Sequence, residues 1–214
     1  MLMCHAYDLL CTVPQSCLAE VLDVFNRTAI AIMEGQQLDM QFEKRQQVSE
    51  PEYIDMIEKK TSVLLAASLQ IGAIIAGTTK TDQKAIYEFG RNLGLMFQIK
   101  DDLLDAFGTE KQVGKKIGGD IVQNKKTYLL TSALDLADDR QKEELLVALN
   151  LSEPKQKIAR TKKLFEETGA REQAEDRMKY YYTQSELALK QVAVEEDRKA
   201  LLYELAASIY ESQF

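Results

Sequence analysis

Apolar residues recur along most of this 214-residue chain at intervals of three and four, the spacing of one helix face. The first clear run predicts a helix from Gln15 to about Gly35, with apolar positions at Leu18, Val21, Leu22, Phe25, Ala29, Ile32 and Met33. Ser49 to Glu52 has the pattern of a capping box, with a proline tolerated in the first turn. A long helix should begin there and run toward Ala76, where Gly77 can end it.

The downstream half shows the same periodicity. Thr81-Asp82 begins a helix whose apolar pattern continues through an aspartate cluster near its C-terminal end, whereas residues 108–119 contain four glycines and predict a loop. Further helical patterns cover Ile121–Ala137, Asp139–Leu149, Glu153–Glu167, Ala170–Val192 and about Glu195–Ser212. No strand-like alternation of convincing length divides them, so the sequence predicts an all-α fold, a single helical domain over residues 1–214.

The composition agrees with that prediction, and the net charge limits the classes of binding partner. Three prolines and no tryptophan, with 45% hydrophobic and 29% charged residues, are typical of a globular helical protein. The net charge of -7 and pI near 5.0 provide no general positive field, so we expect no nucleic-acid partner and only local phosphate binding.

The stretch between Lys60 and Lys80 contains no charged residue, which raises the question whether it is a transmembrane helix. Ser62, Ser68 and Gln70 interrupt it, so we expect no transmembrane segment but a helix buried on most sides. The three cysteines, an odd number without CxxC spacing, and an opening without the features of a signal peptide indicate a protein of the reducing cytoplasm.

The most informative residues are three aspartates, Asp101, Asp102 and Asp105, which share one helix face. Unpaired carboxylates so placed repel one another, and Mg²⁺ relieves such repulsion while keeping water and phosphate oxygens in its shell. A metal-bridged diphosphate is therefore the natural ligand. A solvated acidic helix end is the simpler alternative for the aspartates taken alone.

A local reversal of charge favours the diphosphate interpretation. Between residues 111 and 126 a single acid, Asp120, stands among five lysines: Lys111, Lys115, Lys116, Lys125 and Lys126. Glycines in the same segment allow the backbone to approach a ligand, and the ammonium groups can neutralise phosphate. Gln98, three residues before Asp101, can support an aspartate or a water molecule.

In combination these motifs resemble a known family. FQIKDDLLD (97–105), GKKIGGD (114–120) and KKT (125–127) resemble the second aspartate-rich region of the trans-isoprenyl diphosphate synthases. Upstream, GQQLD (35–39) and Lys60-Thr61 are similar to two further elements, in the family's order. The resemblance spans most of the chain and implies an isoprenoid-synthase helical bundle around a central cavity.

The resemblance also implies roles for individual residues. Mg²⁺ would be bound by Asp101, Asp102, Asp105 and Asp120. Catalytic or diphosphate-contacting roles would fall to Lys60, Thr61, Gln98, Lys115 and Lys125, while Gln36 and Asp39 would help to bind substrate. Lys115 matches the family position better than Lys116. The implied activity is a Mg²⁺-dependent condensation of isopentenyl diphosphate with an allylic diphosphate, in a homodimeric enzyme of the geranylgeranyl or farnesyl class.

One element of the family pattern is absent. The family carries a first aspartate-rich motif that faces the second across the cavity, and no acidic cluster of this chain replaces it. We therefore expect a fold that is incomplete at its N-terminal side, and 214 residues that do not sustain prenyl transfer by themselves. A non-catalytic or regulatory subunit is the first alternative. A terpene cyclase or head-to-head synthase is the second, although the GKxxGxD segment and the KT pair favour chain elongation.

Overall fold

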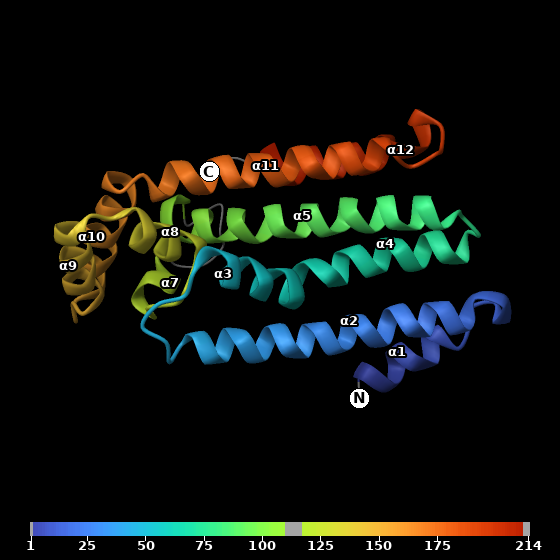
Figure 1. Ribbon diagram of the computed structural model, residues 1–214, viewed down its shortest axis with the longest axis horizontal. Coiled ribbons are helices and arrows are strands. Elements are labelled where there is room, and N and C mark those ends of the chain that lie inside the picture. The colour runs from blue at the N-terminus through green and yellow to red at the C-terminus, as the bar shows by residue number, and fades with distance from the viewer. Residues whose placement is uncertain (1, 110–116, 212–214) are drawn as a thin grey trace.

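The structure, a computed structural model, describes residues 2–109 and 117–211 (Figure 1). Every regular element in these two stretches is helical, which confirms the all-α prediction. The first half comprises α1 Leu2–Leu10, α2 Gln15–Phe42, α3 Glu50–Ile57, the π-helix η1 Glu58–Ser62, α4 Val63–Ile75 and α5 Lys80–Phe107. The second half comprises α7 Gly119–Val122, α8 Tyr128–Leu136, α9 Asp139–Leu149, α10 Pro154–Glu167, α11 Ala170–Lys190 and α12 Glu196–Glu211.

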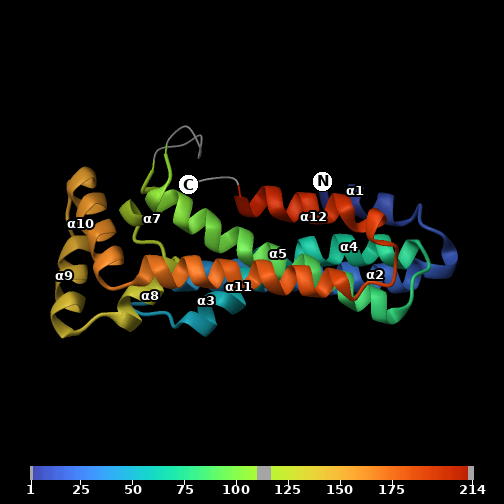
Figure 2. The same cartoon turned by 90° about the horizontal axis from the view of Figure 1, so that it is seen from above.

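Helix α5 is the centre of the arrangement. Helices α2, α4, α5 and α11 lie side by side along the long axis, and the most extensive packing joins α5 to α11 and to α4 (Figure 1). One face of α5 is completely buried, with Leu95, Met96, Ile99 and Leu103 at 0% exposure. Helix α12 covers α5 from another side, and α9 with α10 packs across one end (Figure 2).

Most helix ends lie where the sequence predicts them. The N–H of Ser49 donates to the Glu52 carboxylate at 2.9 Å, which confirms the capping box at the start of α3. Gly77 adopts a left-handed φ of 72° two residues after α4 ends. The aspartate cluster lies in the last two turns of α5, as expected.

Two predicted boundaries are wrong. Helix α2 does not end near Gly35 but continues to Phe42, because Gly35 lies inside the helix, where its missing side chain makes room for a neighbouring backbone. The single helix predicted over residues 121–137 is divided into α7 and α8. Asn124 takes a left-handed φ of 56°, and Thr127 caps the next helix, so Lys125 lies in the connection.

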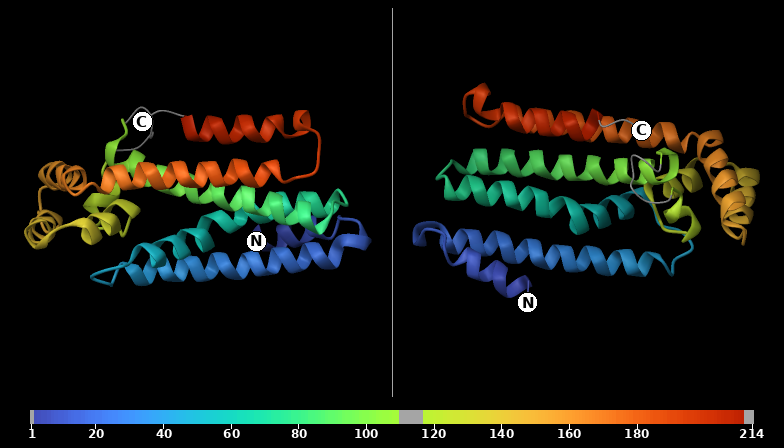
Figure 3. Two further views of the ribbon diagram at one scale, coloured as in Figure 1. Left: turned by 45° about the horizontal axis from the view of Figure 1, so that its top comes forward. Right: turned by 180° about the vertical axis from the view of Figure 1, so that it is seen from behind.

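The uncharged helix is also less enclosed than predicted. Leu64, Ser68, Gly72 and Ile75 form an exposed stripe along α4, with Leu64 52% exposed. In the described part of the chain no helix is long and apolar enough to cross a membrane. Helix α1 packs against α2 (Figure 3).

The C-terminal helix is tied to the C-terminal third of α5 by a buried lysine. Lys100 is 2% exposed, and its ammonium donates to the backbone carbonyls of Ile209 and, at 2.9 Å, Tyr210. Cations favour the C-terminal end of a helix, where carbonyl groups are unpaired. Burial lowers the pKa of Lys100. The Tyr210 ring also stacks on Tyr182 of α11, so α12 is held at two points.

We predict that Lys100→Met lowers the free energy of unfolding by about 1–3 kcal/mol, because two partly buried carbonyls lose a charged donor. Chemical denaturation followed by circular dichroism measures the change. Lys84→Met, at an exposed position of the same helix, should lie within about 0.5 kcal/mol of wild type. Equal stabilities for the two variants would contradict the anchoring role of Lys100.

Candidate diphosphate and metal site

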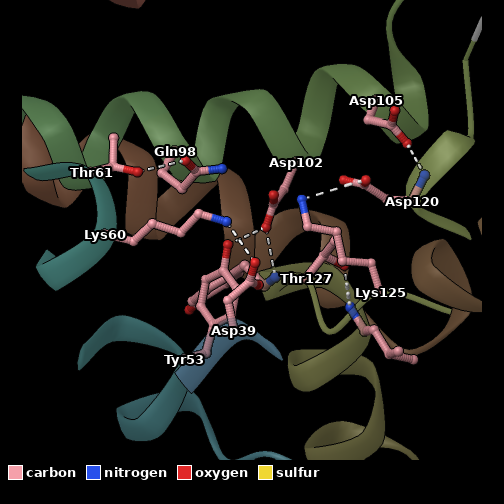
Figure 4. Close-up of polar contacts among 12 residues, drawn as sticks. Asp39, Tyr53, Lys60, Thr61, Gln98, Asp102, Asp105, Asp120, Lys125 and Thr127 are labelled. Carbon is pink, nitrogen blue, oxygen red and sulfur yellow. Dashed lines mark hydrogen bonds and ion pairs between the residues drawn. The ribbon is translucent and has the colours of Figure 1, made fainter. Parts of the chain in front are cut away.

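Motif residues from four segments of the chain meet beside the C-terminal half of α5 (Figure 4). The Lys60 ammonium lies 2.6 Å from the Asp39 carboxylate, which joins η1 to α2. The Thr61 hydroxyl donates to the side-chain oxygen of Gln98 at 3.3 Å, which joins η1 to α5. Both pairs are partly buried, so side chains predicted separately from the sequence are in direct contact.

Asp102 is buried and already bonded within the protein. Its Oδ2 accepts hydrogen bonds from the Tyr53 hydroxyl at 2.5 Å and from the Tyr128 backbone N–H at 2.8 Å, and the residue is 2% exposed. Burial raises the pKa of Asp102 to about 7, although both hydrogen bonds and nearby Lys125 lower it. Burial and the adjacent carboxylate together raise the pKa of Tyr53 well above its ordinary value.

The connection between α7 and α8 supplies a second charged group. Lys125 Nζ lies 3.5 Å from Asp120 Oδ1, and the Asp120 backbone N–H donates to Asp105 at 3.0 Å. Burial lowers the pKa of Lys125, but Asp120, Asp102 and Asp39 together raise it above its ordinary value. Lys125 is therefore a cation, surrounded by three carboxylates and one-third exposed.

Asp101 differs from the other two aspartates of the cluster. It is partly exposed, and its carboxylate makes no ion pair with any residue in the described ranges. Across residues 2–109 and 117–211, no group of three or more His, Cys, Asp or Glu side chains could hold a metal ion. Mg²⁺ usually takes only one or two protein carboxylates and completes its shell with water and phosphate oxygens. Asp101 has the exposure that such a carboxylate needs.

The remaining predicted residue in the described part of the chain, Gln36, makes no hydrogen bond with this group of side chains. Gln36 is exposed on α2, where it lines a groove of about 410 Å³ with Met33 and Met40. Lys115, its competitor Lys116 and Lys111 lie outside the described residues. Sequence reasoning missed Tyr53 and Tyr128, whose contacts with Asp102 join helices far apart in the chain. The one local signal was the position of Tyr128 directly after the KKT motif.

An apolar groove of about 410 Å³ lies between α1, α2 and α4, lined by Phe25, Ala29, Ile32, Leu64 and Ile71, among others. The exposed stripe of α4 contributes Leu64 and Ser68 to its wall. A larger cavity, about 620 Å³, is lined by Glu20, Arg27, Lys80 and Glu88, among others. It lies toward the opposite end of α5 from Asp101, and its lining is of mixed charge and contains none of the motif residues.

Comparisons with known proteins identify the family. The family model of polyprenyl synthetases matches residues 1–168, so the chain belongs to the polyprenyl synthetase family. A geranylgeranyl diphosphate synthase of Sulfolobus acidocaldarius is 38% identical over 193 residues, covering 89% of this chain and 58% of that protein. The chain thus spans about three-fifths of the length of this curated relative.

Solved structures show the same fold. A geranylgeranyl pyrophosphate synthetase from Pyrococcus horikoshii superposes with a TM-score of 0.88 at 32% identity, covering 96% of this chain and 63% of that one. A geranylgeranyl pyrophosphate synthase from Corynebacterium glutamicum, solved with isoprenyl diphosphate and magnesium, gives 0.85 at 29% identity over 94% and 57%. The predicted isoprenoid-synthase fold and the resemblance on which it rests are confirmed.

The raised pKa of Asp102 makes stability depend on pH. Between about pH 4 and 7 the folded protein retains a proton that the unfolded chain releases, so we predict that stability falls as pH rises through this range, by up to ~4 kcal/mol. Asp102→Asn should remove this slope while keeping both hydrogen bonds, because both fall on one oxygen. Urea unfolding at several pH values in metal-free buffer measures it. If the free energy of unfolding of the variant depends on pH as steeply as that of the wild type, groups other than Asp102 cause the dependence.

Proposed function

We propose that this chain carries the diphosphate-binding part of an isoprenyl diphosphate synthase, a prenyltransferase that condenses isopentenyl diphosphate with an allylic diphosphate. The convergence of Asp39, Lys60, Gln98 and Lys125 beside the aspartates of α5 is the observation that carries the proposal. Membership of the polyprenyl synthetase family supports it. A product of the geranylgeranyl or farnesyl class belongs to the same proposal.

The roles follow from charge and exposure. Lys60 and Lys125 would neutralise oxygens of the departing diphosphate, and the hydroxyl of Thr61 and the amide of Gln98 would orient the allylic end beside it. Lys115 would add a further positive charge. When bound, Mg²⁺ supplies electrostatic stabilisation of the leaving group. The apolar groove beside α4 would keep water from the reacting carbons.

Asp101 and Asp120 are the carboxylates that we propose to hold the metal, because Asp101 makes no ion pair among the described residues and the Asp120 side chain is partly exposed, at 16%. The metal roles predicted for Asp102 and Asp105 stay predictions. Hydrogen bonds from Tyr53, Tyr128 and the Asp120 backbone to these two carboxylates favour a supporting place for them.

Other parts of the sequence-based interpretation belong to the proposal as well. We propose a homodimer of single-domain chains in the cytoplasm. Exposed apolar side chains on α1 and the three free cysteines, all before residue 18, support it. Light scattering at micromolar concentration measures the oligomeric state. Gln36 would contact substrate from α2, on the side that carries Met33 and Met40.

We predict that Mg²⁺ together with methylenebisphosphonate raises the melting temperature more than either alone. The carboxylates need the metal, and the metal needs phosphate oxygens to complete its shell. Ligand at about 100 times its Kd stabilises by about 2.7 kcal/mol. Asp101→Asn should lose most of this shift, whereas Asp135→Asn, at an exposed position on α8, should keep it. A melting-temperature shift as large in Asp101→Asn as in the wild type would contradict the assignment of Asp101 to the metal site.

The chain spans about three-fifths of the Sulfolobus relative and carries a single aspartate-rich motif. We predict that the 214 residues alone give no labelled lipid product from isopentenyl and geranyl diphosphates with Mg²⁺. Catalytic groups that act as a unit lose turnover together when some are missing. Robust elongation by a preparation of confirmed mass would reject both this prediction and the non-catalytic alternative.

A further inference from the structure

The lysine and threonine of the KT motif lie in the π-helix η1, which separates α3 from α4. A π-turn inserts one extra residue into an α-helix, is rare, and occurs often at functional sites. Side chains of this turn contact the helices on its two sides. Lys59 and Lys60 pair with Glu34 and Asp39 of α2, while Glu58 and Thr61 contact Arg91 and Gln98 of α5.

Two glycines allow the backbones of α2 and α5 to approach this turn closely. A Cβ at Gly35 of α2 would lie 2.4 Å from the Lys60 backbone nitrogen and 2.8 Å from its Cα. A Cβ at Gly94 of α5 would lie 2.6 Å from the Ser62 Cα. No real Cβ tolerates such distances, and both obstacles are backbone atoms that cannot swing aside.

Neither glycine is needed for its backbone conformation. Both lie within long helices and neither has a positive φ, yet a glycine inside a helix costs roughly 0.5–1 kcal/mol relative to alanine. The structure shows one feature that offsets this cost, which is the close approach of both helices to η1. Each glycine also precedes by one helical turn the residue that contacts the KT pair: Gly35 precedes Asp39, and Gly94 precedes Gln98.

We propose that Gly35 and Gly94 are positioning residues that hold the π-turn between α2 and α5 and thereby aim Lys60 and Thr61 at the diphosphate site. Each residue turns an α-helix by about 100°, so loss of the one-residue insertion would redirect the side chains on one side of it by that amount. The expected effect on ligand binding rests on the proposed function. The role of the two glycines in placing the π-turn is independent of that function.

The chain offers two matched controls. A Cβ at Gly90, one turn before Gly94 on α5, would lie 2.8 Å from the Ala66 Cα, which is the same kind of clash but against α4 rather than η1. A Cβ at Gly72 would meet nothing within 4 Å. Gly90→Ala therefore reproduces the packing defect without touching the π-turn, and Gly72→Ala reproduces only the change of residue type.

The experiment compares Gly35→Ala and Gly94→Ala with these two controls. Hydrogen exchange by mass spectrometry follows the peptide that contains residues 58–62, and calorimetry measures affinity for Mg²⁺ with methylenebisphosphonate. We expect Gly35→Ala and Gly94→Ala to speed exchange in that peptide and to weaken binding by about tenfold, the size of one lost hydrogen bond to a charged group. Gly90→Ala should lower the melting temperature comparably but leave both readouts within about twofold of wild type, a change below 0.5 kcal/mol.

Equal exchange and equal affinity in Gly94→Ala and Gly90→Ala would overturn the proposal. If Gly94→Ala does not fold, Gly35→Ala decides, and failure of both to fold overturns it too, because a displaced turn should leave the bundle intact. Wild-type chain that binds no Mg²⁺–bisphosphonate would reject the proposed function instead. The exchange of residues 58–62 would then still decide the role of the glycines.

Discussion

One buried oxygen, Oδ2 of Asp102, joins three parts of the fold. It accepts the Tyr53 hydroxyl from α3 and the first backbone N–H of α8 at Tyr128, while the aspartate itself belongs to α5. A buried carboxylate without partners would be costly, so these bonds fix the three helices relative to one another. Lys125 precedes Tyr128 by three residues and depends on the same anchor. The position of Lys125 in the candidate site therefore depends on a buried interaction among α3, α5 and α8.

The fold could be predicted to a large extent from local patterns. Helical periodicity predicted the type of the main elements, and Ser49 and Gly77 marked ends that the structure confirms. The failures have a common cause. Gly35 was interpreted as a helix end because glycine often has that role, but it serves a contact with Lys60, twenty-five residues later in the chain. The break after Val122 depends on a left-handed asparagine, which spacing does not reveal.

For the candidate site, too, local motifs predicted some features, whereas features that depend on residues distant in the sequence were missed. Motif order indicated which residues lie together, and Lys60, Asp39, Thr61 and Gln98 do meet. It could not distinguish Asp101 from Asp102, because adjacent aspartates look alike in sequence while one is partly exposed and the other is buried against two tyrosines. Tyr53 carries no pattern of its own, since its role depends on a partner forty-nine residues away.

The motif around Asp101 also contains a residue that points elsewhere. Successive residues on a helix point about 100° apart, so Lys100 reaches the last turn of α12 while Asp101 stays on the side of the aspartate cluster. A mutational scan scored by binding of Mg²⁺ with methylenebisphosphonate would mark both positions as intolerant and would not tell them apart. A scan scored by protein abundance should separate them, because we expect loss of Lys100 to deplete folded protein and loss of Asp101 to leave it unchanged. Intolerance inside a catalytic motif is therefore no proof that a side chain takes part in the chemistry.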